Sequence, residues 1–174
     1  SAASDVYKRQ EHIPACEKGF KDVMSKGPLA AFPMVGIKVT LNDGKYHDVD
    51  SSDLAYQLAA RTAMRDAVKK SSPVLMEPVM KVEVETPSDF QGSVIGDLSS
   101  RRGVVYGTEV NGDDTVINAG VPLGEMFGYA TQLRSLTSGK ANYSMEFEKY
   151  NRCPAFVQEK VIKERAEKMR EEQG

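Results

Sequence analysis

The sequence predicts an α+β protein, and two kinds of apolar spacing predict it. Residues 35–41 and 80–84 alternate apolar with polar side chains, which is the period of a strand with one buried face. Residues 52–70 and 88–102 instead carry small or apolar side chains every three or four positions, as helices with one buried stripe do. Strand and helix signals follow one another, so we expect sheets covered by helices.

The composition limits the function classes. The 174 residues suffice for one large or two small domains, and 40 % hydrophobic with 28 % charged residues is ordinary for a globular protein. A net charge of −2 excludes a global basic signal for nucleic acid, so any RNA contact must come from local patches. Cys16 and Cys153 lie far apart in the sequence and form no motif, which is typical of free thiols in a protein of the reducing cytosol. The two histidines are scattered and lack the spacing of zinc ligands, so we expect no bound metal. No apolar run approaches membrane-spanning length, so we expect no transmembrane segment.

The first half of the chain predicts a hairpin that leads into a helix. Residues 1–10 show no apolar period and are interpreted as a disordered leader or foreign sequence. A helix is expected from Pro14 to the Gly27-Pro28 pair. Strands are then expected over 35–42 and 45–49, because Asn42-Asp43-Gly44 tolerates the positive φ of a tight turn.

The helix over 52–70 is expected to begin at the oxygen-rich run from Asp50 to Asp53. Alanines recur in it at four-residue spacing, and we expect them to form a ridge that packs on a sheet. These alanines are Ala55, Ala59, Ala63 and Ala67.

The second half predicts a more complete domain. After a joint at Pro73 to Pro78, strands are expected over 80–84, 104–110, 115–121 and 141–147. One helix is expected to start at a capping box of Ser88 and Gln91, with Phe90, Val94 and Leu98 inward. The other follows Pro122, with Met126, Phe127, Ala130 and Leu133 inward. This β-α-β-β-α-β order folds into a four-stranded antiparallel sheet with both helices on one face, the ferredoxin-like plan. We expect an amphipathic helix after Pro154, and we expect it to fray into a solvated, charged tail over residues 163–173.

No motif of a catalytic site is found. Gly139-Lys140 lacks the preceding glycine and the following hydroxyl of a phosphate-binding loop. His47, Asp48 and Ser51 superficially offer the parts of a hydrolase, but neighbours on a strand point to opposite faces. We therefore expect that this chain alone has no catalytic residues.

Two features could contact RNA. In the segment Tyr46-His47-Asp48, a ring can stack and polar atoms can bond riboses or base edges, although the composition alone favours an ordinary solvated hairpin. Arg61, Arg65 and Lys69 form a row that could face phosphates or merely solvent. Arg101, Arg102 and Arg134 lie at helix ends, where cations complement the helix dipole with or without RNA.

Several longer motifs together resemble bacterial elongation factor G. The motifs are Gly27-Pro28-Leu29-Ala30, Tyr46-His47-Asp48-Val49-Asp50-Ser51-Ser52, Pro73 through Met80, Gly96-Asp97-Leu98 with Arg101-Arg102-Gly103, and Val121-Pro122-Leu123 through Leu133-Arg134-Ser135. The resemblance runs from Glu11 to Tyr150 in order and spacing, while residues 1–10 look unlike the family. It implies that residues 11–77 form the second half of the fourth domain, a partial ribosomal-protein-like βαβ domain. It further implies that 78–150 form the ferredoxin-like fifth domain, and that 151–174 add a C-terminal helix and charged tail.

The resemblance also implies a role in translation. The family is a ribosome-dependent GTPase that moves tRNA and mRNA through the small subunit, in the cytoplasm and as a monomer. Its fourth domain carries a tip, here Tyr46, His47, Asp48 and Val49, that contacts tRNA and codon in the decoding region. Its fifth domain docks near the stalk base of the large subunit. GTP and magnesium belong to a first domain that this sequence does not include, so no cofactor is expected here.

Other interpretations remain open at this stage. The chain could be a stand-alone RNA- or protein-binding ferredoxin-like module, or a paralogue that acts in ribosome recycling. A hydrolase that uses His47 and Ser51 is a third interpretation, and the opposed directions of neighbouring side chains on a strand disfavour it.

Overall fold

The computed structural model describes residues 10–172, which divide into two compact units. The first, the helical unit, comprises Ser1–Val74 and Pro154–Gly174, and the second, the sheet unit, comprises Leu75–Cys153. The leader expected over residues 1–10 lies outside the described residues except for Gln10.

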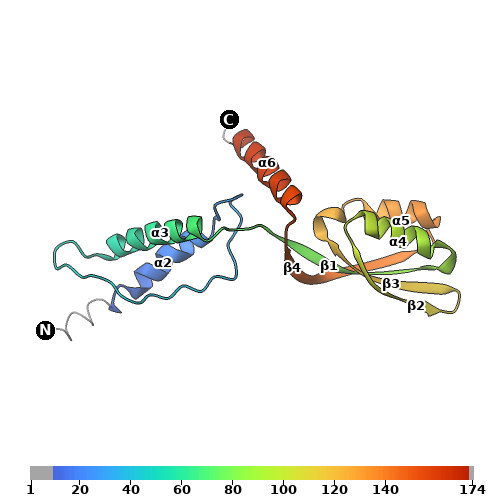
Figure 1. Cartoon of the computed structure of the whole chain (residues 1–174), viewed down its shortest axis with the longest axis horizontal. Coiled ribbons are helices and arrows are strands. Elements are labelled where there is room, and N and C mark those ends of the chain that lie inside the picture. Colours follow the sequence, from blue (N-terminus) through green and yellow to red (C-terminus); the bar gives the residue numbers. More distant parts are fainter. Residues whose placement is uncertain (1–9, 173–174) are drawn as a thin grey trace. The chain divides into compact units, whose positions relative to one another are not determined.

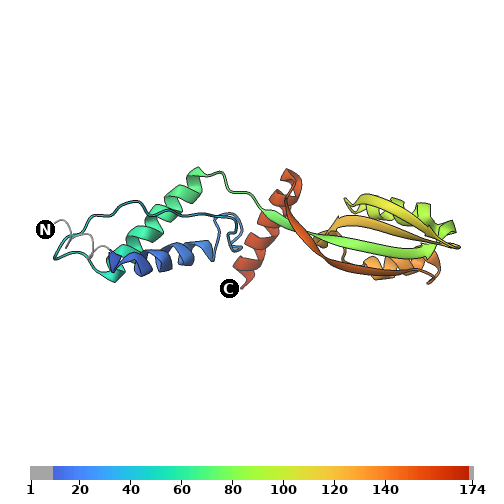
Figure 2. The same ribbon diagram turned by 90° about the horizontal axis from the view of Figure 1, so that it is seen from below.

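The sheet unit is a four-stranded sheet with two helices on one face (Figure 1). Its elements are β1 (Met76–Pro87), η1 (Ser88–Phe90), α4 (Gln91–Ser100), β2 (Val104–Asn111), β3 (Asp114–Pro122), η2 (Leu123–Glu125), α5 (Tyr129–Thr137) and β4 (Asn142–Arg152). The strand order is β2-β3-β1-β4, and every pair is antiparallel. Figure 2, seen from below, shows the strands in front of both helices. This is the ferredoxin-like plan, so the predicted α+β fold class is confirmed.

The core of the sheet unit lies between the sheet and its helices. Val82 and Val84 on β1 lie opposite Ala119 and Ile117 on β3, and all four are fully buried. The helices add Val94, Leu98, Tyr129 and Leu133 to this core. The polar residues between the β1 valines are exposed, so the alternation correctly predicted which face of the strand is buried.

The helix after Pro122 differs in phase from the prediction. Pro122 leads into η2, and α5 begins only after Gly128, which has a φ of 75°. Glycine adopts this left-handed conformation without a steric penalty, and the chain direction it sets turns Tyr129 inward. Phe127 is therefore 81 % exposed and Ala130 is exposed, although both were expected inward. Burial, together with the charge of Asp97, raises the pKa of the Tyr129 hydroxyl.

The predicted capping box of Ser88 and Gln91 is also absent. Ser88 begins the 3₁₀ turn η1, and its hydroxyl lies 2.9 Å from the Thr115 hydroxyl on β3. The helix α4 begins at Gln91 without a side-chain cap on Phe90. The 3₁₀ turn provides local hydrogen bonds at this helix start, so the serine side chain is used for a tertiary contact instead.

In the helical unit, α2 (Ile13–Met24) packs against α3 (Asp53–Lys70) at very short range. A Cβ atom on Gly19 would lie 2.6 Å from the Gln57 carbonyl oxygen and 2.9 Å from the Ala60 Cβ. The buried stripe of α3 is Ala60, Met64 and Val68. The predicted ridge of alanines is wrong, because Ala59, Ala63 and Ala67 are exposed and Ala55 is half-buried.

The two strands predicted over 35–42 and 45–49 are not formed. Residues 32–47 are irregular, and Val35, Ile37, Val39 and Leu41 are between 38 and 67 % exposed. A strand requires a neighbour to which its amides and carbonyls can bond. Within residues 10–172 no segment pairs with this one, since the only sheet described there is that of the sheet unit.

The C-terminal helix is longer than expected. α6 (Ala155–Glu171) continues through most of the predicted frayed tail, so fraying there was a wrong expectation. Its residues are largely exposed and rich in helix-forming Glu, Lys and Arg, with Lys160 and Glu164 as an i,i+4 pair at 3.9 Å. Arg165 also places its guanidinium 5.5 Å from the centre of the Phe32 ring.

The first prediction concerns amide exchange. Val82 and Val84 lie in a central strand bonded on both sides, whereas residues 35–41 are exposed and without strand pairing in the described part of the chain. We expect the amides of Val35 to Leu41 to exchange about a hundredfold faster or more, since exposed irregular segments open at almost no free-energy cost. Equal or greater protection of Val35 to Leu41 in a hydrogen-exchange measurement would contradict this.

A second prediction uses a matched pair of glycines. Gly19→Ala should destabilise the α2–α3 contact by about 1–3 kcal/mol, because backbone atoms of α3 must move away. Gly92→Ala in α4 meets open space and should stabilise that helix by about 0.5–1 kcal/mol. Native-state hydrogen exchange at Met64 and Val94 measures the two units separately, and a neutral Gly19→Ala would disprove the close contact.

Candidate nucleic-acid interface

The tip is defined as residues Tyr46–Val49. It leads into a turn just before α3, and hydrogen bonds between residues 47 and 51 close this turn. The His47 amide donates to Ser51 Oγ at 2.8 Å, and the Ser51 amide donates to the His47 carbonyl at 3.0 Å. The Val49 amide lies 3.4 Å from His47 Nδ1. Three hydrogen bonds within five residues therefore hold the main chain of this turn.

The side chains of this turn point into solvent. The exposed fraction is 70 % for the His47 side chain, 80 % for Asp50 and 84 % for Val49. His47 Nδ1 also lies 3.4 Å from Asp50 Oδ2. An imidazole and a carboxylate are thus presented on a fixed backbone.

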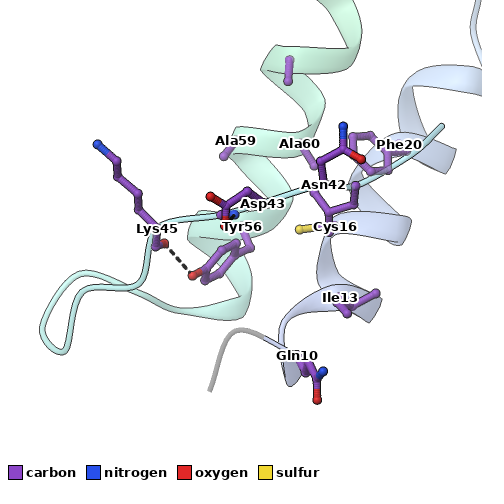
Figure 3. Close-up of a pocket in the computed structure, with 13 residues that line it drawn as sticks. Gln10, Ile13, Cys16, Phe20, Asn42, Asp43, Lys45, Tyr56, Ala59 and Ala60 are labelled. Carbon is purple, nitrogen blue, oxygen red and sulfur yellow. Dashed lines mark hydrogen bonds between the residues drawn. The ribbon is translucent and has the colours of Figure 1, made fainter. Parts of the chain in front are cut away.

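The start of α3 contacts the segment that carries the tip. Ser52 accepts from the Ala55 amide at 3.1 Å, which caps the helix as the sequence predicted. The Tyr56 hydroxyl donates to the Lys45 carbonyl at 2.8 Å, drawn in Figure 3. Its ring stacks on His12 with centroids 4.4 Å apart, and His12 Nδ1 lies 2.7 Å from Asp53 Oδ1.

A cavity of about 530 Å³ opens beside this contact, between α2, α3 and residues 41–45 (Figure 3). Its floor is apolar and includes Ile13, Cys16 and Phe20 of α2. Asn42, Asp43 and Lys45 are among its polar lining residues.

Three of the candidate cations are engaged in internal ion pairs. Arg61 pairs with Asp22 of α2, with its Nε 3.1 Å from Oδ2. Arg102 forms a two-bond pair with Glu77.

Arg101 has several internal partners. Its Nε donates to Asp97 at 2.9 Å, and its Nη1 donates to the Glu125 carbonyl at 2.6 Å. The guanidinium also lies over the Tyr129 ring at 5.1 Å. Such cations connect elements of the fold, and the exposed fraction of the side chain is 17 % for Arg101, 23 % for Arg102 and 32 % for Arg61.

The other three candidates are exposed. Arg65 and Lys69 lie on the outer face of α3, and Arg134 lies near the end of α5. The structure therefore separates the proposed phosphate contacts into an internal and an external group. Contact with RNA stays a prediction for all six.

The arrangement offers little for nucleophilic or metal chemistry. The Ser51 hydroxyl accepts from the main chain of His47, while the imidazole lies against Val49 and Asp50. Burial raises the pKa of the Cys16 and Cys153 thiols, which disfavours thiolates. Over residues 10–172, no cluster of three His, Cys, Asp or Glu side chains could hold a metal ion. In the same range, no helix is long and apolar enough to cross a membrane.

The sequence predicts residues 46–49 as a contact for nucleic acid, which stays a prediction, but it did not indicate the side chains that hold this segment. Tyr56 and His12 carry no motif, and the contact between His12 and Asp53 joins residues 41 positions apart. A ring in the first turn of a capped helix was the only local signal. It predicts that Tyr56 lies near the helix start, without indicating a partner.

The fold and the tip together define a class. The protein is an α+β protein with a ferredoxin-like unit and a helical unit, and the helical unit presents a polar, hydrogen-bonded turn. Two family models match this sequence. One, described as Elongation factor G C-terminus, matches residues 74–161, and the other, described as Elongation factor G, domain IV, matches residues 2–72.

Individual relatives agree. The chain is 55 % identical to elongation factor G of Aquifex pyrophilus over 156 residues, which is 90 % of this chain and 22 % of that protein. It is 52 % identical to elongation factor G 1 of Syntrophus aciditrophicus (strain SB) over 158 residues, 91 % of this chain and 23 % of that protein. A crystal structure of a Thermus thermophilus protein matches with a TM-score of 0.82 at 39 % identity, over 90 % of this chain and 24 % of that chain.

The chain belongs to the elongation factor G family, and its residues correspond to domain IV and the C-terminal domain of those translation factors. It spans less than a quarter of the length of these relatives. The family resemblance predicted from the motifs is therefore confirmed. The domain IV match includes residues 2–10, which were expected to be a disordered leader or foreign sequence.

A third prediction separates the two groups of cations. Arg61→Ala should lower the stability of the helical unit by about 1–3 kcal/mol, because Asp22 loses a half-buried partner. Arg65→Ala, one turn further along α3 and exposed, should change stability by less than about 0.5 kcal/mol. Urea unfolding followed by helix circular dichroism measures both, and equal effects would show that the Asp22 pair does not hold the helices together.

Proposed function

We propose that this chain supplies the ribosome-contacting C-terminal part of a translocation factor. In this proposal the tip contacts tRNA and mRNA in the decoding region of the small subunit, and the sheet unit docks near the stalk base of the large subunit. Membership of the elongation factor G family supports the ribosome as the partner. The observation that carries the role of the tip is the exposed His47 on a turn closed by its own hydrogen bonds.

The tip acts by shape in this proposal. Near-neutral charge and internally paired arginines provide little of the phosphate attraction that drives non-specific RNA binding. A turn with a fixed backbone can instead hold a few polar atoms against a nucleic acid at low entropic cost. The imidazole and the carboxylate both suit hydrogen bonds to riboses and base edges.

The chemical step belongs elsewhere in this proposal. GTP and its magnesium bind in a GTPase domain outside these residues, and the present residues contribute no catalytic group. The factor works in the cytoplasm and as a monomer. Domain boundaries at residues 10, 77 and 150 are proposed with it, although β1 already begins at Met76.

The fourth prediction tests the tip. In a chimera, residues 2–161 replace the matching part of the Aquifex pyrophilus factor. His47→Ala should slow single-round translocation about tenfold, the effect of losing one hydrogen bond to a charged or strongly polar partner. Ribosome-stimulated GTP hydrolysis should stay within about twofold, because the GTPase domain is untouched.

Asp66→Ala provides the control, since Asp66 is exposed on α3 away from the tip. It should affect neither rate. If His47→Ala translocates at the normal rate, the tip has no such role. A chimera that splits ribosomes but does not translocate would favour the recycling paralogue instead.

A further inference from the structure

Three rings form a stack at the tip: Tyr46 belongs to the tip, whereas His12 and Tyr56 come from opposite sides of it in the sequence. His12 directly precedes α2, whereas Tyr56 lies in the first turns of α3. Their rings stack at 4.4 Å with an interplanar angle of 17°. The Tyr46 ring follows at 6.2 Å from His12, at 19°. The stack therefore connects the start of α2, the start of α3 and the tip itself.

Hydrogen bonds fix two of the three rings. His12, the middle ring, has its Nδ1 2.7 Å from Asp53 Oδ1, and its side chain is only 14 % exposed. At one end of the stack, the Tyr56 hydroxyl donates to the Lys45 carbonyl at 2.8 Å. Figure 3 shows the Tyr56 side chain reaching from α3 to this carbonyl. The acceptor belongs to the residue that precedes the tip, so the bond acts on the tip backbone.

We propose that Tyr56 and His12 are positioning residues for the tip: the Tyr56 hydroxyl holds the backbone at Lys45, and His12, tied to Asp53, holds the Tyr56 ring. This inference rests on the proposed function, because it assigns residues that place His47 for its contact. Neither residue touches the nucleic acid in this account. Both act through the direction of the backbone that carries Tyr46 and His47.

The geometry distinguishes positioning from core packing. The buried contact between the helices is made by Gly19 of α2 against Gln57 and Ala60 of α3, and the buried stripe of α3 continues to Met64 and Val68. Tyr56 is only half-buried, and its hydroxyl bonds to a main-chain atom of an irregular segment that has no strand neighbour among residues 10–172. Loss of that bond should free the tip without opening the helix pair.

The test begins with Tyr56→Phe in the 174-residue chain, because phenylalanine keeps the ring and removes only the hydroxyl. Exchange of the His47 and Ser51 amides should accelerate about fivefold, the usual effect of one lost neutral hydrogen bond. Exchange at Met64 and Val68 should not change. Tyr150→Phe is the matched control, since it removes an exposed hydroxyl in the sheet unit and should leave the tip amides unaffected.

His12 is tested by a double-mutant cycle. His12→Ala removes the stack and should accelerate the same two amides, while His12→Phe keeps a stacking ring and should restore most of the protection. Adding His12→Ala to Tyr56→Phe should have little further effect, because both act through one bond. Fully additive effects, unchanged exchange at His47, or equal acceleration at Met64 would each overturn the proposal.

The chimera separates this proposal from the proposed function. Tyr56→Phe should slow translocation in the same direction as His47→Ala, with GTP hydrolysis unchanged. If His47→Ala slows translocation and Tyr56→Phe does not, positioning is disproved while the role of the tip stands. If His47→Ala has no effect, the proposed function fails, and the exchange data alone decide whether Tyr56 and His12 order the tip.

Discussion

The tip is held at the start of α3, and α3 is held by its close approach to α2 at Gly19. Only a hydrogen atom fits between the Gly19 backbone and the Gln57 carbonyl, so the two helix axes approach more closely than ordinary side chains allow. The first turns of α3 then carry the Ser52 cap, Asp53 and Tyr56. A buried contact between helices thereby determines where a solvent-exposed turn lies.

Three arginines of the chain likewise make contacts within the fold. Arg61, Arg101 and Arg102 neutralise carboxylates within their own units, and Arg101 also bonds two main-chain carbonyls. These cations connect elements that are distant in the sequence. A protein that uses its arginines in this way leaves fewer of them for phosphates, so the proposed contact with nucleic acid would depend more on the position of a few atoms than on net charge.

The sequence predicted a strand correctly where the described residues also contain the strand with which it pairs. The alternation around Val82 and Val84 predicted the buried face, because β3 supplies their neighbours. The same alternation over 35–41 predicted a strand for which residues 10–172 contain no pairing partner. On α3, the stripes of Ala59 and Ala60 have the same helical period, and only the approach of α2 decides that Ala60 is buried. The contact of His12 with Tyr56 depends on that same packing, which no local pattern encodes.

The failure of the predicted hairpin does not extend to the tip, and the reason lies in which bonds hold each segment. A strand over 35–41 needs a neighbour along its whole length, since every second amide must find a carbonyl outside the segment. The turn at His47 instead uses acceptors within five residues, on Ser51 and on its own carbonyl and ring. Two contacts of this segment come from farther away in the sequence: the Tyr56 hydroxyl of α3 bonds to the Lys45 carbonyl, and the Tyr46 ring stacks on His12. The segment that carries the motif is therefore held by its own hydrogen bonds and by contacts with His12 and α3, and none of these contacts is a strand pairing.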